Sequence, residues 1–98
     1  MPILEISIMP IGTEETSFST FVTKACDIVK SHGLKYQVTP MSTIVEGPLD
    51  DLMSIAHDVH LLPLQSGANR VITNMTIDER RDKDMDMSSM VNAVTNPL

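Results

Sequence analysis

The amino-acid sequence predicts an α+β fold in which a four-stranded antiparallel sheet carries two helices on one face, with a short third helix at the C-terminal end. Three observations lead to this prediction. Four segments alternate apolar and polar residues with the two-residue period of a strand. Two longer segments repeat apolar residues at the spacing of an amphipathic helix. Along the chain these segments follow in the order β-α-β-β-α-β.

The predicted strands are short and bounded by turn-forming residues. They span residues 3–9, 34–41, 42–46 and 70–77. In the first, Leu4, Ile6 and Ile8 occupy one side. Pro10 is expected to end that strand, and Pro40 to end or interrupt the second, because proline has no N–H to donate to a neighbouring strand.

The predicted helices follow from apolar residues that recur three and four positions apart. They cover residues 17–31, residues 48–62 and residues 87–94. Thr16 or Ser17 can cap the first turn of the first helix. The second helix is expected to end or kink before Pro63, because proline lacks the N–H that an interior helical position needs.

Four strands and two helices in this order specify the ferredoxin-like split β-α-β sandwich. We expect a single domain that spans residues 1–98. Because both helices cover the same face of the sheet, the opposite face is expected to be open.

The composition argues against several classes of protein. The formal net charge of −6 argues against nucleic acid as a partner. A single cysteine excludes an internal disulfide framework. We expect a cytoplasmic chain without a membrane partner, since it has no apolar run long enough to span a bilayer and no signal-peptide pattern. Aromatic residues make up only 3%, whereas methionine occurs eight times.

The open face of the predicted sheet carries a mixed set of side chains, polar but mostly uncharged. From the alternation they are Glu5, Ser7, Met9, Gln37, Thr39, Asn74 and Thr76, with Ile3 and Ile72 among them. The third strand adds either Thr43 and Val45 or Ile44 and Glu46, depending on the turn before it. Such a face suits contact with another subunit, a polar pocket for a small ligand, or exposure to solvent.

Few residues point to catalysis or metal binding. His57 and His60 lie three apart on a predicted helix, but no further ligand is placed beside them, so we expect surface histidines. Cys26 has no neighbouring base and is expected to be a packing residue. Because no phosphate-binding, zinc or nucleophile motif occurs, we expect no catalytic residue, no metal and no cofactor.

Several segments nevertheless follow one another in a distinctive order. The two most specific are residues 40–47, with the pattern P-M-x-T-x-x-E-G, and residues 78–83, with the pattern D-x-R-R-D-K. The others are Ile8-Met9-Pro10-Ile11-Gly12-Thr13, Ser17-Phe18-Ser19, Gly33-Leu34-Lys35-Tyr36 and Arg70-Val71. Over nearly its whole length the chain resembles the small thiamine-binding proteins of the YkoF-like group. It departs from them at Ser42, where glycine is usual, and at Pro63 in the second helix.

The resemblance implies a cytosolic homo-oligomer, from dimer to homotetramer, that binds thiamine (vitamin B1) or a related aminopyrimidine without catalysis, for sequestration, sensing or delivery. The ligand would be a small cationic heterocycle. Met41, Thr43 and Glu46 are candidate ligand-binding residues because they stand in the matching motif. Ser7 and Asn74 join them from the geometry of the open face, and Met9, like Met41, could pack its sulfur on a ring.

The resemblance also gives the charged segment after the fourth strand a role. Arg80, Arg81, Asp82 and Lys83 are expected to form an ion-pair network at a subunit contact, because the guanidinium group pairs well with carboxylates. Two other functions stay open. One is a structural or regulatory oligomerisation module without a small ligand. The other is an enzyme that acts on a pyrimidine or thiazole metabolite.

Overall fold

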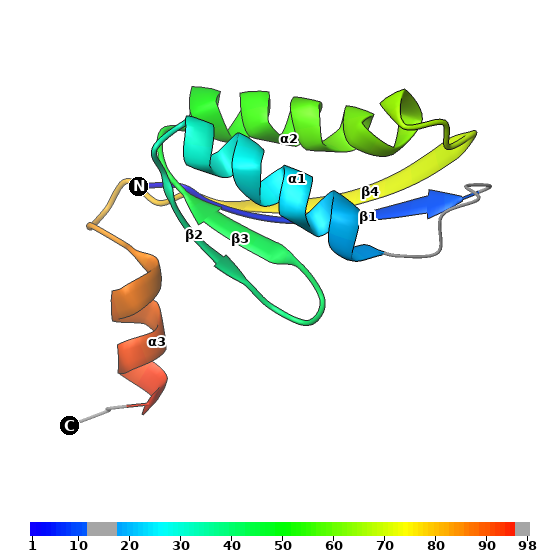
Figure 1. Ribbon diagram of the computed structural model, residues 1–98. Helices are drawn as coiled ribbons and strands as arrows, with labels where there is room; N and C mark the ends of the chain where they lie inside the picture. The colour runs from blue at the N-terminus through cyan, green and yellow to red at the C-terminus, as the bar shows by residue number, and fades with distance from the viewer. Residues whose placement is uncertain (12–17, 96–98) are drawn as a thin grey trace.

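The computed structural model describes residues 1–11 and 18–95 and has the predicted order of elements. The strands form one antiparallel sheet in the spatial order β2-β3-β1-β4. Helices α1 and α2 lie on one face of it, and α3 projects from the end of the molecule where the chain begins (Figure 1). The elements are β1 (Ile3–Ile11), α1 (Phe18–Ser31), β2 (Lys35–Val38), β3 (Thr43–Glu46), α2 (Leu49–Gln65), β4 (Arg70–Asp78) and α3 (Met87–Thr95). This is the ferredoxin-like α+β fold that the sequence predicts.

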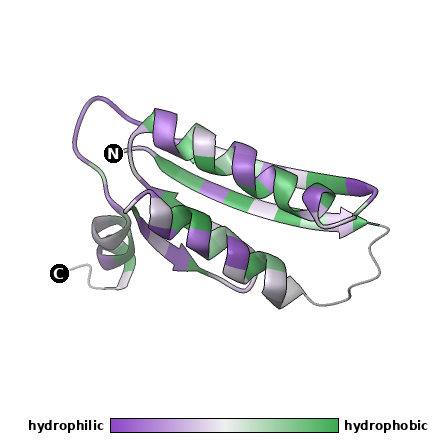
Figure 2. Cartoon of the chain, turned by 45° about the horizontal axis from the view of Figure 1, so that its top comes forward, coloured by the Kyte–Doolittle hydropathy of each residue, from purple (hydrophilic) through white to green (hydrophobic). Residues whose placement is uncertain are grey.

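The core lies between the sheet and the two helices, as the alternation of β1 indicates. Leu4 is fully buried opposite Val45 of β3, and Ile6 is 4% exposed. The helices close the layer with Ala25, Val29, Leu52, Ile55, Ala56 and Val59. Figure 2 shows hydrophobic residues alternating along the strands and recurring along the helices. Burial of this apolar surface is the main force that holds the layers together.

β1 is longer than predicted, because it continues through Pro10 to Ile11. Pro10 pairs with Val71 and Ile11 with Arg70 on β4. Beyond Ile6, however, β1 has no register partner on β3. A proline is tolerated there because one side of the strand needs no N–H donor. The expectation that Pro10 ends the strand is therefore wrong.

α2 also runs further than predicted, since it passes Pro63 and ends at Gln65. Pro63 lies in the last turn, where its missing N–H removes a single helical hydrogen bond. Its carbonyl accepts hydrogen bonds from the backbone N–H groups of Ser66 and Ala68, at 3.1 and 2.9 Å, and its ring is fully buried. These contacts compensate for the lost bond and close the helix before the turn at Gly67.

α1 ends as its sequence indicates, with Gly33 two residues beyond Ser31 in the left-handed region at φ 68°. The capping residues predicted at its start, Thr16 and Ser17, lie outside the described residues. β2 and β3 are shorter than predicted because residues 39–42 form the turn between them.

The face of the sheet opposite α1 and α2 is not fully open, which corrects the sequence-based expectation. Met85 and Met87 pack on Ile3 of β1 and bury it to 9% exposure, with Ile44 of β3 beside them. The segment that leads into α3 therefore covers one end of this face. The other end keeps Met9 and Ile72 exposed, at 53% and 37%.

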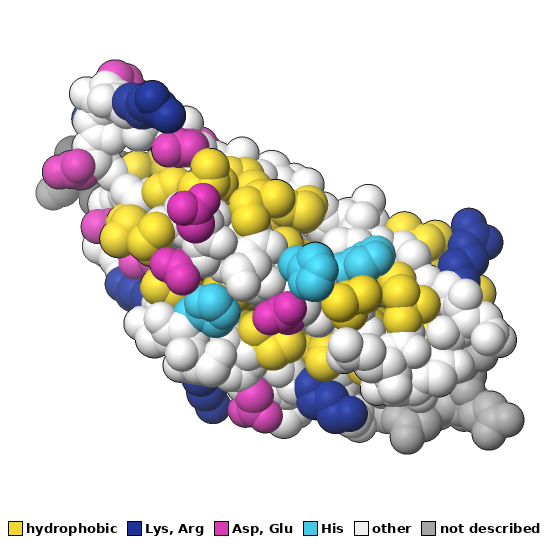
Figure 3. All heavy atoms as spheres, turned by 90° about the horizontal axis from the view of Figure 1, so that it is seen from above, with side chains coloured by type: hydrophobic (Ala, Val, Ile, Leu, Met, Phe, Trp, Pro, Cys, Tyr) yellow, Lys and Arg dark blue, Asp and Glu magenta, His cyan; other side chains and the backbone are white. Residues whose placement is uncertain are grey.

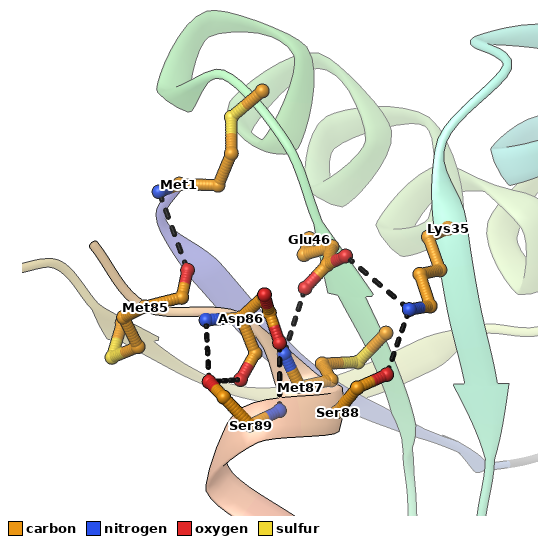
Figure 4. Close-up of polar contacts among 8 residues, drawn as sticks. All are labelled: Met1, Lys35, Glu46, Met85, Asp86, Met87, Ser88 and Ser89. Carbon is orange, nitrogen blue, oxygen red and sulfur yellow. Dashed lines mark hydrogen bonds and ion pairs between the residues drawn. The ribbon is translucent and has the colours of Figure 1, made fainter.

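A reciprocal pair of hydrogen bonds starts α3 at its junction with the sheet. The Asp86 carboxylate accepts from the Ser89 backbone N–H at 2.7 Å, and the Asp86 backbone N–H donates to the Ser89 hydroxyl at 3.3 Å (Figure 4). This is a capping box, which satisfies N–H groups that have no partner inside the helix. The bonds from Ser89 hold the pKa of Asp86 below its ordinary value.

None of the helices in the described part of the chain has the length and hydropathy needed to cross a lipid bilayer.

The core predicts a large difference between two leucines of α2. Leu52 is fully buried and Leu64 is 39% exposed. We expect Leu52→Ala to lower the free energy of unfolding by about 3 kcal/mol, because it leaves a cavity. The same truncation at Leu64 should cost less than about 1 kcal/mol. Urea denaturation measures both; equal effects would contradict the assigned core.

The capping box predicts a pH dependence of α3. A carboxyl group with a lowered pKa in the folded state stabilises that state at neutral pH, and this contribution is lost as pH falls through the lowered value. We expect the helical 13Cα shifts of residues 87–95 to persist to about pH 4 and to decline below it. At pH 7, Asp86→Ala should reduce these shifts, whereas Asp84→Ala, in the preceding loop, should not. Equal behaviour of the two variants would argue against the cap.

Candidate functional site

A fork in the sheet forms the candidate site. β1 pairs with β3 only from Ile3 to Ile6, but with β4 along its whole length to Ile11. Past Ile6 the β2–β3 hairpin and β1 therefore separate. A cavity of about 520 Å³ lies at this fork. Its volume is within the range of pockets that hold small molecules, roughly 300–1,000 Å³.

The walls of the cavity are mainly apolar, and its polar groups come from the two sides of the fork. α1 and α2 contribute Phe21, Val22, Ala25, Val29, Ile55 and Val59. The polar lining residues are Ser7 of β1, Asn74 of β4, and Thr39, Ser42 and Thr43 of the hairpin. Apolar walls with a few polar groups are typical of a site that binds the flat faces of a ring and orients its edge.

Five of the six predicted ligand-binding residues line this one cavity. They are Ser7, Met9, Met41, Thr43 and Asn74. Ser7 and Asn74 are register partners on adjacent strands, so their side chains lie next to each other on the same face. Met41 is 85% exposed at the tip of the hairpin, where its side chain borders the cavity.

The sixth predicted residue, Glu46, does not line the cavity. The register pairs Thr43 with Ile6 and Glu46 with Ile3, so these two side chains point to opposite faces of the sheet. The structure thus decides the alternative that the sequence left open for β3. Thr43 and Val45 face the helices, and Ile44 and Glu46 face the other side.

Glu46 instead connects the sheet to α3. Its carboxylate accepts a hydrogen bond from the backbone N–H of Met87 at 2.8 Å, and Lys35 Nζ lies 4.0 Å away (Figure 4). Lys35 also donates to the Ser88 hydroxyl at 2.9 Å. The Glu46 side chain is only 14% exposed. This carboxylate therefore satisfies a backbone donor at the helix N-terminus and complements the positive end of the helix dipole.

A second carboxylate, Glu5, lies beside the cavity, although no motif of the sequence points to it. The Ser42 hydroxyl, which lines the cavity, donates to Glu5 Oε2 at 3.0 Å. The strand alternation did place Glu5 on the same face as Ser7 and Met9. The alternation alone does not reveal the contact with Ser42, because only the folded hairpin brings Ser42 against Glu5.

Thr39 fixes the position of Ser42 by closing the turn of the hairpin. Its hydroxyl accepts from the backbone N–H of Ser42 at 3.0 Å and from that of Met41 at 3.3 Å. Its backbone N–H donates to the Ser42 carbonyl at 2.8 Å. Pro40 and Met41 form the tip between them. The side chain and the backbone of Thr39 therefore both hold the turn, which places the Ser42 hydroxyl within hydrogen-bond distance of Glu5.

The charged segment after β4 contains one ion pair within the chain. Arg80 and Asp82 form a two-pronged contact, with Arg80 Nε 2.7 Å from the carboxylate. This pairing raises the pKa of the Arg80 guanidinium and lowers the pKa of the Asp82 carboxyl. Arg81 and Lys83 are exposed. Because the Arg80 and Asp82 side chains already pair with each other, they have less capacity for a contact between subunits.

The histidines and the cysteine of the described residues have separate surroundings. His57 lies 3.1 Å from Asp58, and His60 lies 2.7 Å from the Thr73 hydroxyl, so the two histidines have different partners. Cys26 is half-buried on α1. Within residues 1–11 and 18–95, no three potential ligands among His, Cys, Asp and Glu converge on one point.

The fold and the cavity are those of a small α+β protein with a ligand-sized pocket, and comparison with known proteins gives the family. Residues 4–95 match the family model described as "Thiamine-binding protein". This chain therefore belongs to the thiamine-binding protein family. It is 40% identical to the UPF0045 protein YqgV of Bacillus subtilis, over all of this chain and 98% of that protein. A UPF0045 protein of Staphylococcus xylosus is 39% identical, with 100% and 95% of the two chains covered.

Solved structures share the architecture. A hypothetical protein of Methanocaldococcus jannaschii superposes with a TM-score of 0.85 at 32% identity, covering 96% of this chain and 95% of that one. A protein of Thermotoga maritima, proposed to act in thiamine biosynthesis or salvage, superposes with a TM-score of 0.74 at 23% identity, covering 93% and 95%. The second match bears on the fold alone.

The contact between Glu46 and Met87 predicts that α3 detaches when this carboxylate is removed. Glu46→Ala leaves a half-buried N–H without its partner, which we expect to favour opening of α3 by about 1.5 kcal/mol. Faster hydrogen exchange of the amides of residues 87–95 would report this. Glu5→Ala removes the same group from the adjacent strand and should leave their exchange unchanged. Equal protection of α3 in both variants would contradict the assignment.

Proposed function

We propose that this protein binds thiamine, or a related aminopyrimidine, in the cavity at the fork of the sheet, and that it does so without catalysing a reaction. The observation that carries the proposal is the convergence of five motif-derived and face-derived residues on one cavity of ligand size. Membership in the thiamine-binding protein family supports the choice of ligand. Such a protein would sequester, sense or deliver its ligand.

The lining suits the neutral aminopyrimidine ring. Phe21 and the aliphatic side chains of α1 provide apolar surface for ring faces. Met9 and Met41 add polarisable sulfur where the chain has few aromatic residues. Ser7, Thr43 and Asn74 offer hydroxyl and amide groups, which can both donate to ring nitrogens and accept from an exocyclic amine.

Glu5 suits the cationic thiazolium ring. No aspartate or glutamate of the described residues lines the cavity itself. The Glu5 carboxylate, however, accepts a hydrogen bond from the hydroxyl of Ser42, which does line it. A carboxylate near the rim can attract a permanent cation without being buried itself. Ser42, which stands where similar proteins usually carry glycine, thus links the hairpin to this charge. Glu46 is a weaker candidate for this role because its carboxylate is engaged with α3.

We also propose that the chain acts as a cytoplasmic homo-oligomer, from dimer to homotetramer. In support, three apolar side chains on one helix are left in contact with water. Met90, Val91 and Val94 of α3 are 44%, 52% and 80% exposed. A short helix with this much exposed apolar surface gains stability when a neighbouring subunit covers it.

Calorimetric titration of the purified protein with thiamine tests the ligand. We expect saturable binding and thermal stabilisation; at about 100-fold excess over the dissociation constant this amounts to about 2.7 kcal/mol. Glu5→Gln should weaken thiamine binding by about two- to fivefold, the effect of losing one exposed charge pair. It should leave binding of the neutral hydroxymethylpyrimidine half unchanged, because that half carries no cation.

Glu46→Gln is the matched control, since it makes the same change on the same face outside the cavity. We expect this variant to bind thiamine as the wild type does. If Glu46→Gln weakens binding and Glu5→Gln does not, the cation site lies at the α3 end instead. If thiamine, its phosphates and hydroxymethylpyrimidine all give neither heat nor a thermal shift, the proposed function is wrong.

A further inference from the structure

The described lining of the cavity at the fork contains no positively charged side chain. The chain has seven lysines and arginines and three histidines, and all of them lie within residues 1–11 and 18–95. None of these side chains lines the cavity, whose polar groups are hydroxyls and an amide beside apolar walls. Proteins bind a phosphate group with arginine or lysine, or with several backbone N–H groups at a helix N-terminus. The described lining therefore lacks the side chains that a phosphate requires.

The basic residues of the sheet lie outside the lining, at its two ends. Only β2 and β4 carry one, Lys35 and Arg70 respectively. Lys35 is held at the α3 end, where it donates to the Ser88 hydroxyl at 2.9 Å. Arg70 pairs with Ile11 at the far end of β1, two residues before Ile72, which does line the cavity. On the helix side, Figure 3 shows the basic side chains toward the margins, with hydrophobic side chains and histidines between them.

The charged group in contact with the lining is a carboxylate. Glu5 Oε2 accepts a hydrogen bond at 3.0 Å from the hydroxyl of Ser42, which lines the cavity. Glu5 is exposed, and no basic group among the described residues forms an ion pair with it. Its charge is therefore not neutralised within the described chain, and the formal net charge of −6 has the same sign. A cation is attracted to such a rim, and an anion is repelled from it.

Phosphorylation of thiamine changes the ligand close to its cationic ring. The phosphates of thiamine are esters of the hydroxyethyl arm, which is attached to the thiazolium ring itself. If the thiazolium lies near Glu5, the phosphate lies near Glu5 as well, and the two negative charges repel each other. If the phosphate instead enters the cavity, it loses water among apolar walls without a basic partner. Both placements disfavour the phosphorylated ligand.

We propose that the cavity selects the unphosphorylated ligand over its phosphate esters, and that Glu5 is the residue that sets this selectivity. The inference rests on the proposed binding of thiamine and specifies the form that is bound. A ligand with a free hydroxyl is produced by hydrolysis of a phosphate ester and is consumed by phosphoryl transfer. The protein therefore holds its ligand between these two classes of reaction and does not retain the phosphorylated product.

Calorimetric titration with thiamine, thiamine monophosphate and thiamine diphosphate tests the selectivity, in buffer free of divalent cations that would neutralise the phosphates. We expect both phosphates to bind about tenfold or more weakly than thiamine, because a phosphate is left without a cationic partner. Added salt should weaken the binding of thiamine and strengthen that of the diphosphate, because it screens an attraction in the first case and a repulsion in the second.

Glu5→Gln tests the residue, because the amide oxygen can still accept from Ser42 but carries no charge. We expect thiamine to bind about two- to fivefold more weakly to this variant, and the diphosphate about two- to fivefold more tightly. Glu79→Gln is the matched control. It makes the same change directly after Asp78, which pairs with Ile3 at the end of β1 opposite the fork. This control should leave both affinities unchanged.

The outcomes separate this inference from the proposed function. Wild-type protein that binds the diphosphate as tightly as thiamine would overturn the selectivity and leave ligand binding standing. A folded Glu5→Gln variant, verified by circular dichroism, that keeps the wild-type ratio of the two affinities would overturn the role of Glu5. Absence of binding for thiamine and both phosphates, together with hydroxymethylpyrimidine, would overturn the proposed function and the selectivity with it.

Discussion

The register of β1 is the constraint on which the rest of this structure depends. This strand pairs with β4 over its full length but with β3 over only four residues. The alternation along β1 fixes which of its side chains enter the core. Because residues paired across strands face the same side of the sheet, the register of β1 also fixes which side chains of β3 and β4 face the core. Where the pairing with β3 stops, the hairpin and β1 separate and the cavity forms. A shift of one residue would exchange the core and the open face along every strand.

As a result, one end of the sheet forms the cavity and the other end anchors α3. At the fork, the hairpin turn held by Thr39 brings Ser42 to Glu5 and places polar groups beside apolar walls. At the other end, Met85 and Met87 cover Ile3, and Glu46 binds the first backbone N–H of α3. The two carboxylates that face the same side of the sheet therefore serve different purposes. Glu46 accepts a hydrogen bond from the backbone of α3, whereas Glu5 lies beside the cavity.

Much of the candidate site could be predicted from the sequence. The predictions that differ from the structure do so for a shared physical reason. Ser7, Met9 and Asn74 follow from alternation along long strands, where one assigned residue fixes the rest. Thr43 and Glu46 belong to one motif, but an odd separation along a strand sends their side chains to opposite faces. Glu5 lies on the predicted face, but no motif singles it out, because its partner Ser42 is brought to it only by the folded hairpin turn.

The sequence by itself determined the order of the elements, the α+β class and the composition of the core, because the periods of strands and helices are local properties of the chain. Only the tertiary structure decided how far the elements extend and which polar groups meet. Pro10 stays in a strand because one side of that strand has no partner, and Pro63 stays in a helix because its carbonyl and ring find partners in the closing turn. The first outcome depends on the strands that pair with β1, and the second on the turn after α2 together with the burial of the proline ring. The position of Glu46 under α3 likewise arises from residues 41 positions apart.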